Sequence, residues 1–232
     1  MTTNPLLPAA VIFDMDGVLV DTNPFHVQKW EALLAEYGIA FDRKALPKQV
    51  LGPGNDPTLR HFFGERITAD DRRRLSEELE ARFRRAFAPH AKPLPGVGRL
   101  ISECHDHGVL VALASAAMSK NVNFILDALK LRPYFHVILT GDEITQSKPH
   151  PEIFVKTARK LRLLPADCVA LEDSFAGIEA AKRAGMKCVA VASTFPAPEL
   201  GTHTQADLVV QTLEELNLQK LRKLFGRVAA GA

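Results

Sequence analysis

The stretch Phe13-Asp14-Met15-Asp16-Gly17-Val18-Leu19-Val20-Asp21-Thr22 directly follows a short apolar run that begins at residue 9. Such a run is typical of a buried strand, so Asp14 and Asp16 are predicted where a strand opens into a loop. Gly17 then allows the backbone to turn sharply. In open α/β sheets, ligands bind beyond the carboxyl ends of the strands, where paired acids can supply a nucleophile, a proton donor and a metal site. An Asx-type turn that only ends the strand is the alternative.

The rest of the sequence alternates strand-like and helix-like segments. Five further short runs are rich in Val, Ile and Leu, as in strands covered on both faces, at residues 109–114, 136–140, 168–171, 187–192 and 206–210. Amphipathic segments separate most of them, at residues 97–107, 119–129, 151–161 and 175–183. This alternation predicts an α/β fold with a doubly wound parallel sheet. The apolar spacing in 213–225 predicts a last helix that packs onto the core.

Residues 23–93 depart from this pattern, because they contain helix-like stretches at 25–37, 57–63 and 68–87 and no convincing strand. We therefore expect a core domain made of residues 1–22 and 94–232, with a small α-helical cap domain, 23–93, inserted after the first strand. Hinges near residues 22–24 and 92–96 would let such a lid open and close. The arginines and glutamates of 68–87 alternate, which favours a solvated, salt-bridged helix face over a phosphate site.

The composition argues against several classes of protein. A net charge of +2 over 232 residues does not favour a nucleic-acid-binding or membrane-surface protein. No apolar run approaches the roughly 20 residues of a membrane-spanning helix, and no secretory signal is visible. Cys104, Cys168 and Cys188 lie far apart in apolar patterns, which predicts buried, reduced thiols. We expect a cytoplasmic monomer without nucleic-acid or membrane partners.

Polar residues follow several of the predicted strands. Ser115 follows the second strand, Lys148 comes after the third, and Glu172 and Asp173 end the fourth. Because parallel strands end at the same edge of a sheet, these groups are expected beside the two acids that follow the first strand. A hydroxyl, a lysine and four acids delivered by consecutive strands indicate a functional site rather than a set of solvated loops.

This set of groups fits phosphoryl transfer to a carboxylate. The repulsion between an anionic nucleophile and an anionic phosphate would be offset by Mg²⁺ and a lysine ammonium. Asp14 is then the nucleophile that forms an aspartyl-phosphate, and Asp16 is the general acid and base. Ser115 would donate a hydrogen bond to the phosphoryl oxygens, and Lys148 would pair with both phosphate and nucleophile. The expected metal shell consists of Asp14, the backbone carbonyl of Asp16, Glu172 and Asp173.

In these motifs the chain resembles the haloacid dehalogenase superfamily, and more narrowly its β-phosphoglucomutase-like branch with a small helical cap. The matching residues are Asp14 to Thr22, Ser115, Ser147-Lys-Pro-His-Pro151 and Glu172-Asp-Ser174, in the order and spacing of the family. The resemblance extends over nearly the whole chain and is weakest between residues 40 and 95. It implies a Rossmann-like core, Mg²⁺ as cofactor and a small phosphorylated metabolite as substrate.

Individual residues argue against some of the activities known within this superfamily. Halide-removing members lack the second aspartate of the pair, so Asp16 argues against that reaction. Phosphonoacetaldehyde-cleaving members use a cap lysine to form a Schiff base with the substrate. Nothing marks Lys48, near the loop 51–56, as a lysine with that role. A non-catalytic binding protein on the same fold would be expected to lose Asp14, Asp16 or Lys148, and all three are present.

Mutase and phosphatase activities are the remaining alternatives. By resemblance, His26 and Trp30 match the hinge and substrate pocket of β-phosphoglucomutases, although a core position for Trp30 is an equal alternative. The run Ser115 to Asn121 resembles one that holds the second phosphate in those mutases, but it is two residues longer. Its candidates for substrate binding are Ala116, Lys120 and Asn121. For Lys120 and Asn121 the alternative is that they are ordinary residues in the first turn of a helix.

The cap loop around Gly52 favours hydrolysis. When the chain is aligned on Gly52, Leu51 and Asn55 stand where the mutases have a lysine and an arginine. A bisphosphate intermediate needs cations to hold its distal phosphate, and two of them are missing here. Gly52 and Asn55 are further candidates for substrate binding. We expect a phosphatase of small phosphorylated sugars, with a hexose phosphate mutase of the β-phosphoglucomutase type as the alternative.

Overall fold

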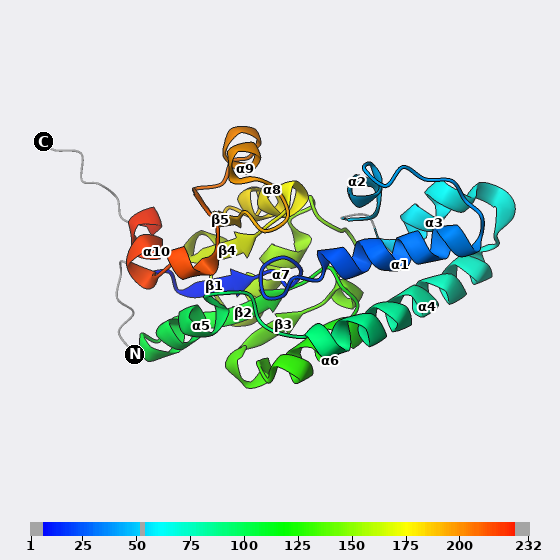
Figure 1. Ribbon diagram of the computed structural model, residues 1–232. Coiled ribbons are helices and arrows are strands. Elements are labelled where there is room, and N and C mark those ends of the chain that lie inside the picture. Colours follow the sequence, from blue (N-terminus) through cyan, green and yellow to red (C-terminus); the bar gives the residue numbers. More distant parts are fainter. Residues whose placement is uncertain (1–6, 52–53, 226–232) are drawn as a thin grey trace, which may run out of the picture. The chain divides into compact units, whose positions relative to one another are not determined.

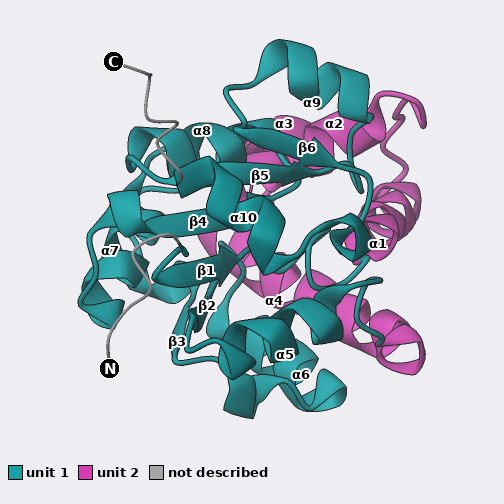
Figure 2. Cartoon of the chain, turned by 90° about the vertical axis from the view of Figure 1, so that its left-hand side faces the viewer, with its two compact units in different colours: residues 1–21, 92–232 teal, residues 22–91 magenta. Residues whose placement is uncertain are grey.

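The computed structural model describes residues 7–51 and 54–225 of the chain. Contacts divide the chain into two compact units, which Figure 2 shows in different colours. Unit 1 consists of residues 1–21 and 92–232, and unit 2 consists of residues 22–91. Within the described ranges, none of the helices combines the length and apolar character needed to cross a membrane.

Unit 1 is built on a six-stranded parallel sheet with the strand order β3-β2-β1-β4-β5-β6 (Figure 1). Its strands are β1 (Ala10–Phe13), β2 (Leu110–Ala114), β3 (Val137–Leu139), β4 (Cys168–Glu172), β5 (Lys187–Val191) and β6 (Leu208–Val210). The predicted α/β fold with a doubly wound parallel sheet is confirmed, and each strand lies within two residues of its predicted bounds. The strand order reverses between β1 and β4, the place where ligands bind in such sheets.

Helices cover both faces of this sheet, which explains why its strands are continuous apolar runs. Ala10 and Ile12 of β1 belong to one apolar cluster with residues of α7 and α8, while Val11 and Phe13 are fully buried on the opposite face. Figure 2 shows α7 and α8 along one side of the sheet, and α5 and α6 along the other. The helices of unit 1 are α5 (Val97–Asp106), α6 (Ser119–Leu129), α7 (Glu152–Leu161), α8 (Phe175–Arg183), α9 (Ala197–His203) and α10 (Leu218–Phe225).

Two helical segments of unit 1 differ from their prediction. The predicted helix 213–225 is a 3₁₀ turn, η6 (Leu213–Glu215), followed by the shorter α10. Helix α9 was not predicted, because it has seven residues and buries only Leu200. The other 3₁₀ turns are η1 (Gly64–Arg66), η2 (Ala88–His90), η3 (Arg132–Tyr134), η4 (Gly141–Glu143) and η5 (Pro165–Asp167).

In its described part, unit 2 contains helices only, namely α1 (Asn23–Glu36), α2 (Leu46–Val50), α3 (Asn55–Phe63) and α4 (Ala69–Phe87). The five-residue α2 was too short to show a helical period in the sequence. Helix α4 begins at a capping box, in which Thr68 and Asp71 each accept a hydrogen bond from the backbone of the other. Its apolar residues recur at four-residue spacing on one face, which is buried, at Leu75, Leu79, Phe83 and Phe87.

The charged face of α4 is salt-bridged, as the alternating charges predict. Arg82 pairs with Glu36 at 2.6 Å and with Glu78 at 2.5 Å. Arg72 pairs with Asp56 at 2.9 Å. Because these guanidinium groups already have carboxylate partners within unit 2, the structure favours the solvated, ion-paired interpretation of this face over a phosphate site.

The three cysteines are free and buried, as predicted. Burial raises the pKa of the Cys104 and Cys168 thiols to about 12. These thiols therefore stay protonated near neutral pH, which makes them poor nucleophiles.

Candidate active site

Asp14 is the first residue after β1, and a tight turn follows it. The Asp14 N–H donates to the carbonyl of Leu171 in β4 at 3.0 Å, and the Gly17 N–H donates to the carbonyl of Val20 at 2.7 Å. Gly17 has a φ of +76°, and a Cβ added there would lie 1.9 Å from Oδ2 of Asp173. Only glycine satisfies both the turn and this close approach. The turn therefore brings the loop after β1 directly against the loop after β4.

Lys148 connects groups at the carboxyl ends of three strands. Its ammonium lies 2.6 Å from Oδ1 of Asp14, 2.5 Å from Oε1 of Glu172 and 3.4 Å from the carbonyl of Ala114 at the end of β2. The Lys148 and Asp14 side chains are each 10% exposed and that of Glu172 is fully buried. In such a dry site, charged hydrogen bonds are stronger than in water and fix their partners in place.

Glu172 is held by hydrogen bonds to both of its carboxylate oxygens. While Oε1 accepts from Lys148, Oε2 accepts from the Asp173 N–H at 3.1 Å, the Ser174 N–H at 3.3 Å and the Ser174 hydroxyl at 3.0 Å. Ser174 also caps α8 by accepting from the Gly177 N–H at 3.0 Å. A Cβ on Gly177 would lie 2.0 Å from the Glu172 carboxylate, so this helix start requires glycine.

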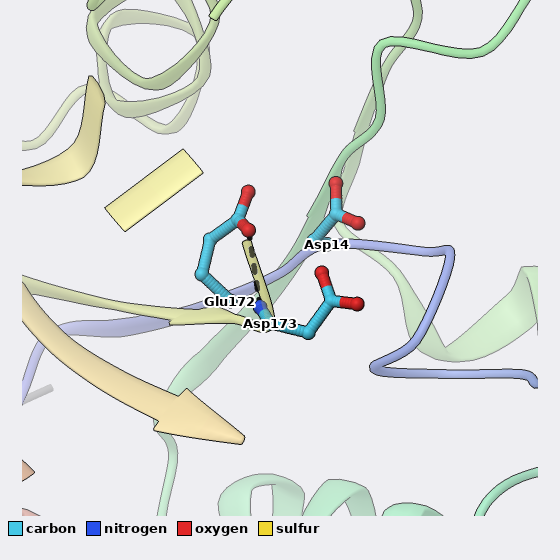
Figure 3. A group of neighbouring side chains, drawn as sticks. All are labelled: Asp14, Glu172 and Asp173. Carbon is cyan, nitrogen blue, oxygen red and sulfur yellow. Dashed lines mark hydrogen bonds between the residues drawn. The ribbon is translucent and has the colours of Figure 1, made fainter. Parts of the chain in front are cut away.

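Three acids form a buried group with the geometry of a metal site, which we call the acidic cluster: Asp14, Glu172 and Asp173 (Figure 3). One carboxylate oxygen from each lies within 4.8 Å of the others. The donors are all hard oxygens, and Lys148, the one lysine among the described residues that contacts the cluster, leaves it with excess negative charge. This donor set and charge fit a hard divalent cation such as Mg²⁺. The side chain of Asp16 is not part of the cluster, and its backbone carbonyl remains a predicted ligand.

The electrostatics of the acidic cluster reflect this excess of charge. Burial raises the pKa of Asp173 to about 7, the charge of Glu172 acts in the same direction, and a hydrogen bond from Thr194 opposes both. Burial also raises the pKa of Asp14, although Lys148 opposes it. For Lys148, burial disfavours the ammonium, but the carboxylates of Asp14 and Glu172 outweigh burial and raise its pKa. A bound cation would favour the ionised form of both aspartates.

The segment after β2 contains four of the predicted site residues. Ser115 is fully buried, and its hydroxyl oxygen accepts from the Ala117 N–H at 3.1 Å, which leaves the hydroxyl proton to be donated. Because Ala114 contacts Lys148, Ser115 follows a residue at the edge of the site. Ala116 is exposed. In the first turn of α6, Lys120 is exposed and Asn121 is buried.

The substrate-binding candidates of the helical region lie in unit 2. The His26 ring stacks on Phe83, with 4.3 Å between ring centroids. Trp30 is 1% exposed within the apolar cluster of this unit, which favours its core interpretation over a sugar-facing one. The Asn55 amide donates to Oε1 of Glu80 at 2.7 Å. Gly52 lies outside the described residues.

A second buried polar group lies in unit 2, which we call the Glu80 cluster: Lys29, Asn55 and Glu80. The Lys29 ammonium donates to the same Glu80 oxygen at 2.5 Å, and the two side chains are 4% and 10% exposed. Burial would raise the pKa of Glu80, but Lys29, the Asn55 hydrogen bond and His26 together outweigh burial and lower it. Sequence reasoning missed Lys29 and Glu80, because each resembles a solvated helix residue and 51 positions separate them.

Sequence reasoning also missed two hydroxyl groups in the loop after β5. The Thr194 hydroxyl donates to Oδ2 of Asp173, and the Ser193 hydroxyl donates to the carbonyl of Gly17 at 2.5 Å. Both follow a parallel strand at its carboxyl end, as Ser115 does. The rule that predicts Ser115 would therefore have found them, had it been applied to the fifth strand.

Comparisons with known proteins point to one family. The sequence pattern of the haloacid dehalogenase-like hydrolases matches residues 11–191. The chain is 34% identical to β-phosphoglucomutase of Bacillus subtilis over 221 residues, covering 92% of this chain and 94% of that protein. It is 32% identical to hexitol phosphatase B of Escherichia coli, covering 91% and 96%. The crystal structure of β-phosphoglucomutase from Clostridium difficile superposes with a TM-score of 0.83 at 28% identity, covering 94% and 96%.

Proposed function

Because the chain belongs to the haloacid dehalogenase-like hydrolases, we propose that it is a Mg²⁺-dependent phosphatase of small phosphorylated sugars that acts through an aspartyl-phosphate. It is an enzyme of the phosphatase or phosphomutase type. The observation that carries the finer proposal is Lys148, whose ammonium joins Asp14 to Glu172 beside Asp173. The names of the bacterial relatives support a phosphorylated carbohydrate as substrate.

In the first step, a carboxylate oxygen of Asp14 attacks the phosphorus atom of the substrate. The bond between phosphorus and the sugar oxygen breaks, and the Asp16 carboxyl group gives its proton to that oxygen. Lys148 offsets the negative charge of nucleophile and phosphate together, because its ammonium already contacts Asp14. The Ser115 hydroxyl proton is available to a phosphoryl oxygen.

In the second step, the Asp16 carboxylate takes a proton from water while the water oxygen attacks the phosphorus atom. The bond between phosphorus and Asp14 breaks, inorganic phosphate leaves, and both aspartates return to their starting state. In a mutase, a sugar hydroxyl would replace the water in this step.

We propose that Asp14 and Asp173 hold the cation, together with the backbone carbonyl of Asp16. Glu172 is better placed to hold Lys148 and the start of α8, since both of its oxygens accept hydrogen bonds from the protein. When bound, Mg²⁺ supplies positive charge that stabilises the transferring phosphoryl group.

The charge balance of the Glu80 cluster supports hydrolysis over the mutase alternative. Asn55 brings no positive charge, and Lys29 is neutralised by Glu80. The Glu80 cluster therefore offers no net positive charge to the distal phosphate of a bisphosphate. The mutase alternative is supported by the identity with the Bacillus subtilis enzyme over nearly the full length of both chains.

We further propose that unit 2 acts as a cap that opens and closes. The boundaries between the units, at residues 21/22 and 91/92, lie at or next to the segments that the sequence predicts as hinges, which supports this role. The buried free thiols support a cytoplasmic location, since thiols persist in reducing compartments. We propose a monomer without nucleic-acid or membrane partners.

The deciding experiment is ³¹P NMR of the protein with Mg²⁺ and β-glucose 1-phosphate, primed with a trace of the 1,6-bisphosphate. A panel of sugar and hexitol monophosphates is tested in parallel. We expect free phosphate to accumulate with at least one monophosphate. Conversion of glucose 1-phosphate to glucose 6-phosphate without free phosphate would instead establish the mutase. Asp14→Asn is the control, and phosphate release by that variant at the wild-type rate would contradict the proposed nucleophile.

A further inference from the structure

We propose that Thr194, in the loop after β5, is a positioning residue that orients the Asp173 carboxylate for the cation. The inference rests on the proposed function, because it assumes that Asp173 is a metal ligand. Thr194 is not itself placed among the ligands or the reacting groups. It acts through Asp173.

The contacts around Asp173 distinguish its two carboxylate oxygens. Oδ2 accepts the hydroxyl hydrogen bond of Thr194, and the Cα of Gly17 lies against the same oxygen, since an added Cβ would meet it at 1.9 Å. None of the described residues donates a hydrogen bond to Oδ1. The protein therefore holds one oxygen of this carboxylate and leaves the other for a cation.

The physical need for such a contact follows from the side chain of aspartate. Its terminal torsion joins sp³ and sp² carbons and has only broad preferences, so the carboxylate plane is weakly fixed by the backbone. A hydrogen bond to one oxygen fixes that plane before the cation arrives. Outer contacts of this kind typically change metal affinity by about 10- to 100-fold when they are removed.

The neighbouring Ser193 provides a matched control. Its hydroxyl belongs to the same loop and donates at 2.5 Å to the carbonyl of Gly17, not to the carboxylate of Asp173. If the loop only needed to be tied to the turn after β1, Ser193 and Thr194 would be equivalent. If orientation of the carboxylate matters, only the loss of the Thr194 hydroxyl weakens metal binding. Thr194 is partly exposed and Ser193 is exposed, so neither change removes a core side chain.

The experiment measures Mg²⁺ binding to the metal-stripped protein by isothermal titration calorimetry, without substrate. The variants are Thr194→Val, which keeps the shape and removes the hydroxyl, Thr194→Ser, which restores a hydroxyl, and Ser193→Ala. We expect the Kd for Mg²⁺ to rise about 10- to 100-fold in Thr194→Val and to stay within about threefold of wild type in the other two. Circular dichroism and thermal unfolding verify that each variant is folded.

Two results would overturn the inference. One is wild-type Mg²⁺ affinity in folded Thr194→Val, and the other is an equal loss in Ser193→Ala, which would indicate a general effect of the loop. If the wild-type protein itself binds no Mg²⁺, the proposed metal dependence fails, which is a different result from a variant that binds normally.

A kinetic measurement gives a second readout. In Thr194→Val, kcat at saturating Mg²⁺ should return to within about threefold of wild type, while the Mg²⁺ concentration for half-maximal activity rises about 10- to 100-fold. A loss of kcat that no Mg²⁺ concentration restores would contradict a positioning role through the metal ligand.

Discussion

Each unit of the chain contains a buried polar cluster, and the two clusters differ in charge balance. In unit 1, Asp14, Glu172 and Asp173 share one ammonium, and burial raises the pKa of both aspartates. In unit 2, Glu80 accepts hydrogen bonds from the Lys29 ammonium and the Asn55 amide, and its pKa is lowered despite burial. Burial alone therefore does not decide the state of an acid. The number of positive partners does.

This difference separates a binding site from an element of structure. Buried charge without enough partners destabilises a fold, so a cluster that keeps such an excess needs a cation or substrate to complete it. A balanced cluster needs nothing further. By this criterion we expect the acidic cluster to bind a cation, whereas the Glu80 cluster joins helices α1, α3 and α4 to one another. Changes to the two clusters should therefore have opposite consequences.

Asp14→Asn is expected to have the largest effect on activity and little effect on stability. Loss of the proposed nucleophile should lower turnover by at least about 10³-fold. Stability should be unchanged or higher in the metal-free protein, because the change removes one charge from a cluster with too many. Phosphate release and urea unfolding measure the two effects. A variant that is both inactive and strongly destabilised would contradict the proposed difference in charge balance between the two clusters.

Lys29→Met is expected to show the reverse pattern. It removes the positive charge nearest to a buried carboxylate of a balanced cluster, which typically costs about 3–5 kcal/mol in the free energy of unfolding. Trp30 is the only tryptophan of the chain and is buried in unit 2, so its fluorescence during urea unfolding reports on this unit. The double variant Lys29→Met/Glu80→Leu should recover most of the loss. A double variant as unstable as the single one would contradict the charge-balance explanation.

The sequence predicts the unit 1 cluster far better than the unit 2 cluster, for a physical reason. Strand runs such as 109–114 identify a parallel sheet, and a parallel sheet necessarily brings the residues after its strands to one edge. Asp14, Lys148 and Glu172 could therefore be expected to lie together from strand positions alone. Lys29 and Glu80 meet because two helices pack at a particular rotation, which no local pattern specifies. The role of Trp30 is equally hard to predict from the sequence, since its spacing fits a core position or a substrate pocket equally well.

The pH dependence of stability should also distinguish the clusters. Asp173 has a pKa of about 7 in the folded chain against about 3.9 when unfolded, so the folded state binds more protons between these values. The metal-free protein should therefore lose stability as the pH rises from about 4 to about 7. We expect the melting temperature to be several degrees lower at pH 7.5 than at pH 5, and Mg²⁺ to recover it most at the higher pH.

The control for this pH effect is Asp173→Asn, in which the fall between pH 5 and 7.5 should be much smaller. Glu80 should act in the opposite direction. Its lowered pKa contributes stability above its unfolded value of about 4.3, and this contribution is lost as the pH falls further. A metal-free protein whose melting temperature rises steadily from pH 5 to 7.5 would contradict the raised pKa values of the acidic cluster.

Asn55→Ala is expected to have the smallest effect, and it tests whether the Glu80 cluster has a role besides structure. The change removes a hydrogen bond of 2.7 Å to Glu80, so the free energy of unfolding should fall by about 1–2 kcal/mol, as reported by Trp30 fluorescence. If Asn55 serves only this cluster, KM for the best monophosphate should stay within about twofold of wild type. A KM that rises tenfold with unchanged stability would instead place Asn55 in contact with substrate, as its position in the sequence predicts. It would also show that a charge-balanced cluster can take part in binding.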